Sequence, residues 1–163
     1  MASPEEIFTR ITGELEVPML IVTTVAGHLR SGCLVGFSTQ CSIDPPRYLV
    51  CLSDKNHTTR VAAAATALAV HFVPESARAL AELFGSETDD EIDKFARCEW
   101  HPGPLGLPLL DGCERWFAGR ILNRRRLGDH IGHVLAPFAA SAAADENILR
   151  FGQVKEMEPG HEA

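Results

Sequence analysis

The sequence predicts a mainly β protein, an antiparallel barrel of six or seven strands with two or three short peripheral helices. β-branched and apolar runs of strand length recur along the chain, and hairpin-length turns join the early ones. The regular strand-helix alternation that is typical of a doubly wound parallel sheet does not occur. Neither a repeat nor a low-complexity linker divides the chain, so we expect residues 1–163 to form one domain.

Composition excludes several classes of protein. The formal charge of -7 and the pI near 5.4 argue against a nucleic-acid-binding surface, and the run Arg124–Arg126 is too short to change that. The segment MASPEEIF lacks the basic and apolar regions of a signal peptide, and no apolar run approaches the ~20 residues of a membrane span. Five cysteines without a CxxC pair predict no metal site and favour a reducing, cytoplasmic setting.

The first third of the chain predicts a helix followed by a hairpin. Ser3 as N-cap and Pro4 as the first helical residue, with apolar side chains at helical spacing behind them, predict a helix over about 4–15. The apolar, β-branched stretch 18–26 and the stretch 32–39 predict two strands joined by a turn at 27–32.

The middle of the chain alternates short elements. Asp44-Pro45-Pro46 interrupts strand pairing because proline has no N–H to donate, so 48–53 is expected as a separate strand. Thr58 or Thr59 would cap an alanine-rich helix. A strand over 68–73 and a second helix, from Ser76 to Gly85, complete this part.

The last part is less regular. The acidic stretch 86–93 is expected to be exposed, and the glycine- and proline-rich stretch 101–112 to be a loop. Two strands over 113–123 and 132–140 would be joined through 124–131. A final strand is predicted within 148–154, and the tail after about 155 is expected to be disordered.

The stretch Ser31–Thr59 is the candidate ligand site. It is rich in glycine and in hydroxyl side chains, which allow a ligand to approach the backbone and offer donors to a phosphate. No GxGxxG, P-loop or GxSxG motif is present, so a nucleotide would have to bind at the edge of the barrel. The alternative is that these residues only form turns and caps.

The order of short motifs along residues 15–140 resembles the flavin reductase family, which has the FMN-binding split-barrel fold. No single motif is specific to this family, but the order in which the motifs occur points to it. The matching pieces are Val22-Thr23-Thr24, Ser42-Ile43-Asp44-Pro45-Pro46, Leu49-Val50-Cys51-Leu52, Thr58, Leu68–Val73, Leu80-Ala81-Glu82-Leu83-Phe84 and Gly128-Asp129-His130.

The resemblance implies a homodimer that binds FMN or FAD near the dimer interface, with NAD(P)H as reductant and a monooxygenase as a partner for the reduced flavin. It places Val35, Gly36, Phe37 and Ser38 along the isoalloxazine ring, and Gln40, Cys41 and Ser42 near the ribityl chain and phosphate. It places Ser53, Asn56, His57 and Thr58 at the phosphate, beside the start of the alanine-rich helix. His130 is the candidate catalytic residue, near the nicotinamide, and Phe84 would lean over the flavin.

Several alternatives stay open at this point. The family pattern Ser-Ser-Phe is replaced here by Gly36-Phe37-Ser38, and a one-residue shift in a strand turns a side chain to the opposite face. His130 could instead be held by Asp129, and Phe84 could belong to the core. A non-enzymatic flavin carrier or sensor, or a flavoprotein with a deazaflavin donor, would show the same motifs.

Overall fold

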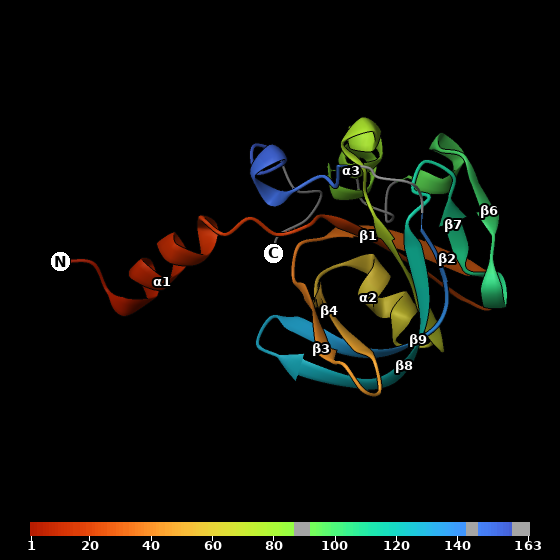
Figure 1. The fold of residues 1–163 in the computed structure, drawn as a ribbon, viewed down its shortest axis with the longest axis horizontal. Coiled ribbons are helices and arrows are strands. Elements are labelled where there is room, and N and C mark those ends of the chain that lie inside the picture. Colours follow the sequence, from red (N-terminus) through yellow and green to blue (C-terminus); the bar gives the residue numbers. More distant parts are fainter. Residues whose placement is uncertain (87–91, 143–146, 158–163) are drawn as a thin grey trace.

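The computed structural model describes residues 1–86, 92–142 and 147–157 (Figure 1). The helices are α1 (Pro4–Gly13), α2 (His57–Ala62) and α3 (Arg78–Ser86). The strands are β1 (Leu20–Ala26), β2 (Leu29–Val35), β3 (Ser38–Ser42), β4 (Arg47–Ser53), β5 (Ala67–Phe72), β6 (Trp100–Pro102), β7 (Pro108–Leu110), β8 (Trp116–Leu127) and β9 (His130–Ser141).

Seven of these strands form one antiparallel sheet, which confirms the prediction of a mainly β fold. Their order is β2-β1-β5-β8-β9-β4-β3. The two edge strands, β2 and β3, are consecutive in the chain and are linked only by Gly36 and Phe37. The chain itself therefore connects one edge of the sheet to the other. A hydrogen bond from the Cys51 N–H to the Phe37 carbonyl (2.9 Å) holds this connection against β4. The fold is a curved sheet whose edges meet at residues 36–37.

Apolar side chains fill both sides of this sheet. The inside of the curve is packed by alternate residues of the strands, because successive side chains point to opposite faces. They include Leu20, Val22, Cys33, Val35, Val50, Leu52, Leu68, Val70 and Leu135. On the outside, α3 and the stretch around Phe95 cover Ile21 and Val73. The sheet is therefore a middle layer between an interior core and a helical cover.

The hairpin of β8 and β9 is longer than predicted. Strand β8 continues through the arginine run to Leu127, and β9 begins at His130, so the expected connection over 124–131 shrinks to Gly128 and Asp129. Gly128 has φ +77°, the left-handed conformation that a two-residue turn requires and that glycine adopts without strain. The polar character of the stretch concealed its pairing with β9.

The stretch expected as a loop over 101–112 contains the short hairpin of β6 and β7, so that prediction was wrong. Pro102 pairs with Pro108, and both lie at strand ends, where a missing N–H costs little. The strand predicted within 148–154 was also wrong, because Ile148 and Arg150 form only isolated bridges. Of the acidic stretch and the tail, residues 87–91 and 158–163 lie outside the described residues.

The alanine-rich helix begins earlier than predicted and is short. Asn56, not Thr58 or Thr59, is the N-cap of α2, and its Oδ1 accepts from the Thr58 N–H (2.9 Å). The helix ends at Ala62, after six residues. Its N-terminal N–H groups are thus partly satisfied within the chain.

Helix α1 forms as predicted, although it ends at Gly13. Ser3 and Glu6 make a capping box (2.7 and 3.2 Å) that satisfies the first N–H groups. The helix extends away from the sheet (Figure 1), and none of its residues is buried. None of the helices in the described residues is long and apolar enough to cross a membrane.

Candidate functional site

A large cleft lies between α1 and the edge where β2 meets β3 and β4. Its volume is about 740 Å³, within the range of ligand sites, and its walls are mainly apolar. The lining residues are Phe8, Thr9, Thr12, Gly13, Leu15, Val17, Met19, Cys33, Leu34, Val35, Gly36, Phe37, Cys51, Leu52, Ser53, Asn56, His130 and Phe151.

The cleft brings together two distant parts of the predicted site. One part comes from the stretch singled out in the sequence, and the other is His130 at the start of β9. The pairing of β4 with β9 explains why these two parts lie together, because Ser53, the last residue of β4, pairs with His130. The predicted residues that line the cleft are Val35, Gly36, Phe37, Ser53, Asn56 and His130.

Phe37 and His130 lie together at the mouth of the cleft. Their ring centroids are 4.9 Å apart, and Phe37 remains 63% exposed because it lies between two strands instead of within one. His130 Nδ1 donates to the Asp129 carboxylate (2.7 Å), and this hydrogen bond lowers the pKa of Asp129. With Nδ1 bonded in this way, a neutral His130 presents Nε2 as its acceptor.

Two polar residues of the predicted set lie where the cleft meets α2. Ser53 and Asn56 line it, whereas His57 and Thr58 lie behind it and bond to β2. Ser31 Oγ is 3.2 Å from His57 Nδ1 and 2.8 Å from Thr58 Oγ1. His57 and Thr58 therefore hold the loop against the barrel and are not among the residues that line the cleft.

The β3 residues of the predicted set lie outside the cleft. Ser38 Oγ is 2.9 Å from Tyr48 Oη, and Gln40 Nε2 donates to the Ser42 carbonyl (3.1 Å). Gln40 and Cys41 are exposed on the edge strand, where a bulge shifts the register with β4. These residues are therefore not among those that line the cleft.

Phe84 is a core residue that does not line the cleft. It is 2% exposed, packs edge-to-face on Phe95 (5.6 Å between centroids), and sits so close to Gly32 that a Cβ there would be 2.8 Å from its ring. A Phe84→Ala variant is therefore expected to lose about 3–5 kcal/mol in the free energy of unfolding, measured with urea.

The matched control for that experiment is Phe84→Leu, which keeps most of the volume and should cost less than about 1.5 kcal/mol. Ligand affinity of the folded fraction should stay unchanged in both variants. A selective loss of affinity at unchanged stability would instead place Phe84 in the binding site.

Sequence reasoning missed much of the cleft wall. The missed residues come from α1 and its linker, from Met19, from the strand positions Cys33, Leu34, Cys51 and Leu52, and from Phe151 near the C-terminus. Burial raises the pKa of the Cys51 thiol, so this cysteine stays protonated and acts as a packing residue. The apolar residues at helical spacing in α1 were the signal in the sequence that could have suggested that this helix lines the cleft.

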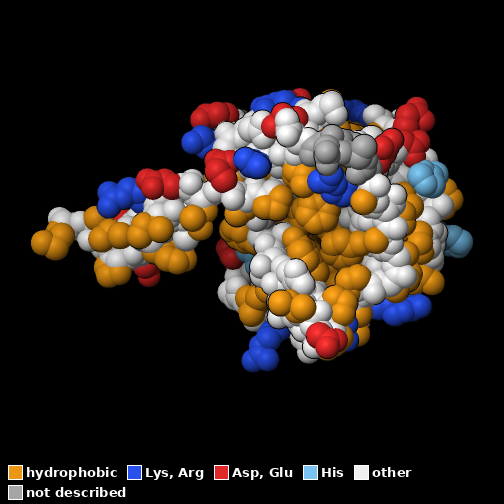
Figure 2. Space-filling view, viewed as in Figure 1, with side chains coloured by type: hydrophobic (Ala, Val, Ile, Leu, Met, Phe, Trp, Pro, Cys, Tyr) orange, Lys and Arg blue, Asp and Glu red, His pale blue; other side chains and the backbone are white. Residues whose placement is uncertain are grey.

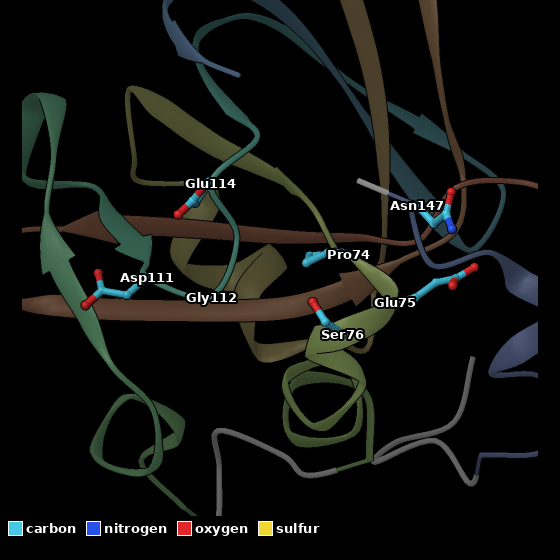
Figure 3. Close-up of a pocket in the computed structure, with 7 residues that line it drawn as sticks. All are labelled: Pro74, Glu75, Ser76, Asp111, Gly112, Glu114 and Asn147. Carbon is cyan, nitrogen blue, oxygen red and sulfur yellow. The ribbon is translucent and has the colours of Figure 1, made fainter. Parts of the chain in front are cut away.

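A second hollow, of about 490 Å³, shares no lining residue with the cleft (Figure 3). Figure 3 shows three carboxylates around it, from Glu75, Asp111 and Glu114. Gln153 Nε2 donates to Glu75, and His101 Nδ1 lies 2.6 Å from Asp111. Its negative charge would repel a phosphate-bearing ligand, so the cleft beside α1 is the candidate site for a nucleotide.

The residues of the cleft fit a flavin. Its apolar walls suit a flat aromatic ring, and Gly36 leaves the backbone accessible beside Met19. Ser53 and Asn56 provide polar groups beside the start of α2, and a nucleotide needs a few such groups in an otherwise apolar site. In the described residues no cluster of His, Cys, Asp or Glu is arranged to hold a metal ion.

Comparisons with known proteins agree with this geometry. The FMN reductase (NADH) RutF of Stutzerimonas stutzeri is 32% identical over 110 residues, which cover 68% of this chain and 63% of RutF. The reductase subunit HsaB of a Mycobacterium tuberculosis flavin-dependent monooxygenase is 25% identical over 76% of this chain and 64% of HsaB. The match thus spans slightly less than two thirds of these relatives.

A solved structure shares the fold. The NADH:FAD oxidoreductase SgcE6 of Streptomyces globisporus, in complex with NAD and FAD fragments, superimposes with a TM-score of 0.81 at 22% identity, over 92% of this chain and 90% of that one. The family model described as "Flavin reductase like domain" matches residues 12–156. The chain belongs to the flavin reductase like domain family.

Proposed function

We propose that this protein is an NAD(P)H-dependent flavin reductase that reduces FMN or FAD. The observation that carries the proposal is the cleft, which combines the small-residue stretch around Gly36 with His130 in a chain of this family. A bound flavin would supply the redox chemistry, with reduced nicotinamide as the hydride donor. The protein contributes binding, orientation and exclusion of water.

Each part of the cleft has a role in this proposal. Val35 and Gly36 would bind the ring through backbone and apolar contact, and Ser53 and Asn56 would bind the polar chain of the nucleotide. His130, oriented by Asp129, would help to position the nicotinamide. The ring of Phe37 lies against that of His130 at a tilt and would shield the reacting face from water.

An anaerobic experiment tests the proposal. The purified protein is mixed with FMN or FAD, then with NADH or NADPH, and the absorbance of oxidised flavin is followed. We expect rapid bleaching, and a His130→Ala variant is expected to lower kcat/KM for the nicotinamide about 10-fold because the positioning group is lost. His28→Ala, in the β1–β2 turn outside the cleft, is the matched control and should behave as the wild type.

Two results would contradict the proposal. A flavin that binds but stays oxidised with both nicotinamide nucleotides would indicate a carrier or a protein with another donor. Unchanged kinetics in His130→Ala would remove that residue from the mechanism while leaving the activity itself in place.

The proposal extends to partners and location. HsaB is named as the reductase subunit of a monooxygenase, which supports delivery of reduced flavin to an oxygenase. We propose a homodimer, because exposed apolar side chains surround the cleft. The odd number of cysteines and the absence of a CxxC pair in the sequence support a reducing, cytoplasmic setting.

A further inference from the structure

The turn of the β8–β9 hairpin is held against the loop between β4 and α2. The hairpin end extends past the neighbouring strands β3 and β4 (Figure 1), and basic side chains lie beside it at the lower left of Figure 2. Only Gly128 and Asp129 separate β8 from β9, so His130 is the first residue after the turn. The position of the turn therefore determines where the His130 ring lies in the cleft.

One guanidinium group bridges the turn and the loop. Arg126 Nη1 donates both to Asp54 Oδ2 and to the Gly128 carbonyl, each at 2.9 Å. The Asp54 N–H donates in turn to the Asp129 carbonyl, also at 2.9 Å. Arg126 and Asp54 thus bond to each other and to both residues of the turn, and we call these four residues the clasp.

The loop is the fixed side of the clasp. Thr59 Oγ1 donates to the Ser53 carbonyl (2.5 Å), and the Asn56 N–H donates to the same carbonyl (3.1 Å). Ser53, Asn56 and Thr59 are all buried. Because Asp54 follows Ser53 directly, its carboxylate is attached to a segment that hydrogen bonds and burial already hold in place.

The turn is the exposed side of the clasp. The Asp129 side chain is 65% exposed, and Leu127 just before the turn is 48% exposed. Packing against the core therefore contributes little to the position of the turn, and its hydrogen bonds contribute more. His130 Nδ1 is bonded to the Asp129 carboxylate (2.7 Å), so a movement of the turn would also move the imidazole ring.

We propose that Arg126 is a positioning residue, which fixes the His130 ring relative to Ser53 and Asn56 through the clasp. This inference rests on the proposed function, in which His130 positions the nicotinamide while Ser53 and Asn56 bind the flavin. Arg126 is not among the residues that line the cleft, so it acts through His130 and not on a ligand. The flavin affinity depends on the buried loop and is therefore expected to be independent of Arg126.

Hydrogen exchange of the protein without any ligand tests the clasp itself. The Asp54 N–H exchanges when its bond to Asp129 opens, so its rate reports how firmly the turn is held. Arg126→Gln should speed this exchange about fivefold, the limit for an exposed ion pair, and the difference from the wild type should vanish at about 1 M salt. Arg125→Gln is the matched control, because the neighbouring side chain of β8 points to the opposite face, and it should leave the rate unchanged.

Steady-state kinetics test the effect on His130. Arg126→Gln should lower kcat/KM for the nicotinamide about fivefold, while the flavin dissociation constant stays within about twofold of the wild type. In a His130→Ala background the same substitution should have no further effect, because Arg126 acts through His130. Arg126→Lys keeps the charge but not the planar group, and it should retain part of the wild-type value.

The outcomes separate the clasp from the proposed function. An Asp54 amide that exchanges at the wild-type rate in Arg126→Gln would overturn the clasp. Effects of Arg126→Gln and His130→Ala that add up would overturn the action of Arg126 through His130. A wild-type protein that does not reduce flavin would contradict the proposed function and the kinetic role of Arg126, whereas the exchange rates would still decide whether the clasp holds the turn.

Discussion

Replacing Gly36 by leucine is expected to weaken flavin binding about 100-fold while the protein stays folded. The position of a Cβ on Gly36 lies 3.8 Å from Met19, which is ordinary contact, and the backbone there needs no left-handed conformation. The larger side chain therefore fits the fold but occupies the cleft that Gly36 and Met19 line together. Overfilling a packed site costs about 1–3 kcal/mol, which corresponds to the expected change in dissociation constant.

A titration of FMN followed by fluorescence measures this effect, and urea unfolding measures the stability of the same samples. Gly36→Ala is the matched control, since its single methyl group reaches only van der Waals distance. It should bind flavin with an affinity within about threefold of the wild type, because a small volume change is absorbed by side-chain movement. Wild-type affinity in Gly36→Leu would show that the flavin does not use this wall.

Lowering the pH from 6.5 to 4 is expected to remove about 3 kcal/mol of stability through His71 alone. His71 is fully buried; its Nδ1–H donates to the Ile21 carbonyl (2.9 Å), and its Nε2 accepts from the Leu110 N–H (3.1 Å). Burial lowers its pKa from 6.5 to about 4. Between these values the unfolded chain binds the proton and the folded protein does not, so stability is complete above pH 6.5 and falls with the pH.

His133 adds to this dependence with the same sign, because burial lowers its pKa as well. Urea unfolding at several pH values should therefore be compared between the wild type and His71→Leu. The variant leaves the Ile21 carbonyl and the Leu110 N–H unpaired and should be less stable by about 3 kcal/mol near neutral pH. Its stability should also depend less on pH, and an equal slope in both proteins would contradict the role of His71.

The sequence predicted the elements whose signals are local. Ser3 and Pro4 marked the start of α1, and the β-branched run before Ala26 marked β1. Prediction from the sequence failed where pairing with another strand overrides the local composition. The arginines after Asn123 look like a polar connection, yet β9 supplies them with a partner strand, and Pro102 and Pro108 look like a loop but end two short strands.

The sequence also located half of the candidate site. The stretch around Gly36 and the Gly128-Asp129-His130 turn were identified by their residues, and both contribute to the cleft. Ser38, Gln40 and Cys41 were assigned from the family resemblance, but they lie on the edge strand β3 and are not among the residues that line the cleft. One residue of register decides which face of a strand a side chain occupies, and register is set by pairing.

By itself, the sequence determined a mainly β protein of the flavin reductase family, and it singled out the small-residue stretch around Gly36 that lines the cleft. The tertiary structure alone decided that α1, Met19 and Phe151 also line the cleft, and that Phe84 belongs to the core. The physical reason is that strand and cap signals arise between neighbours in the chain. A cleft arises between segments that meet only when the sheet curves and its edges join at Gly36 and Phe37.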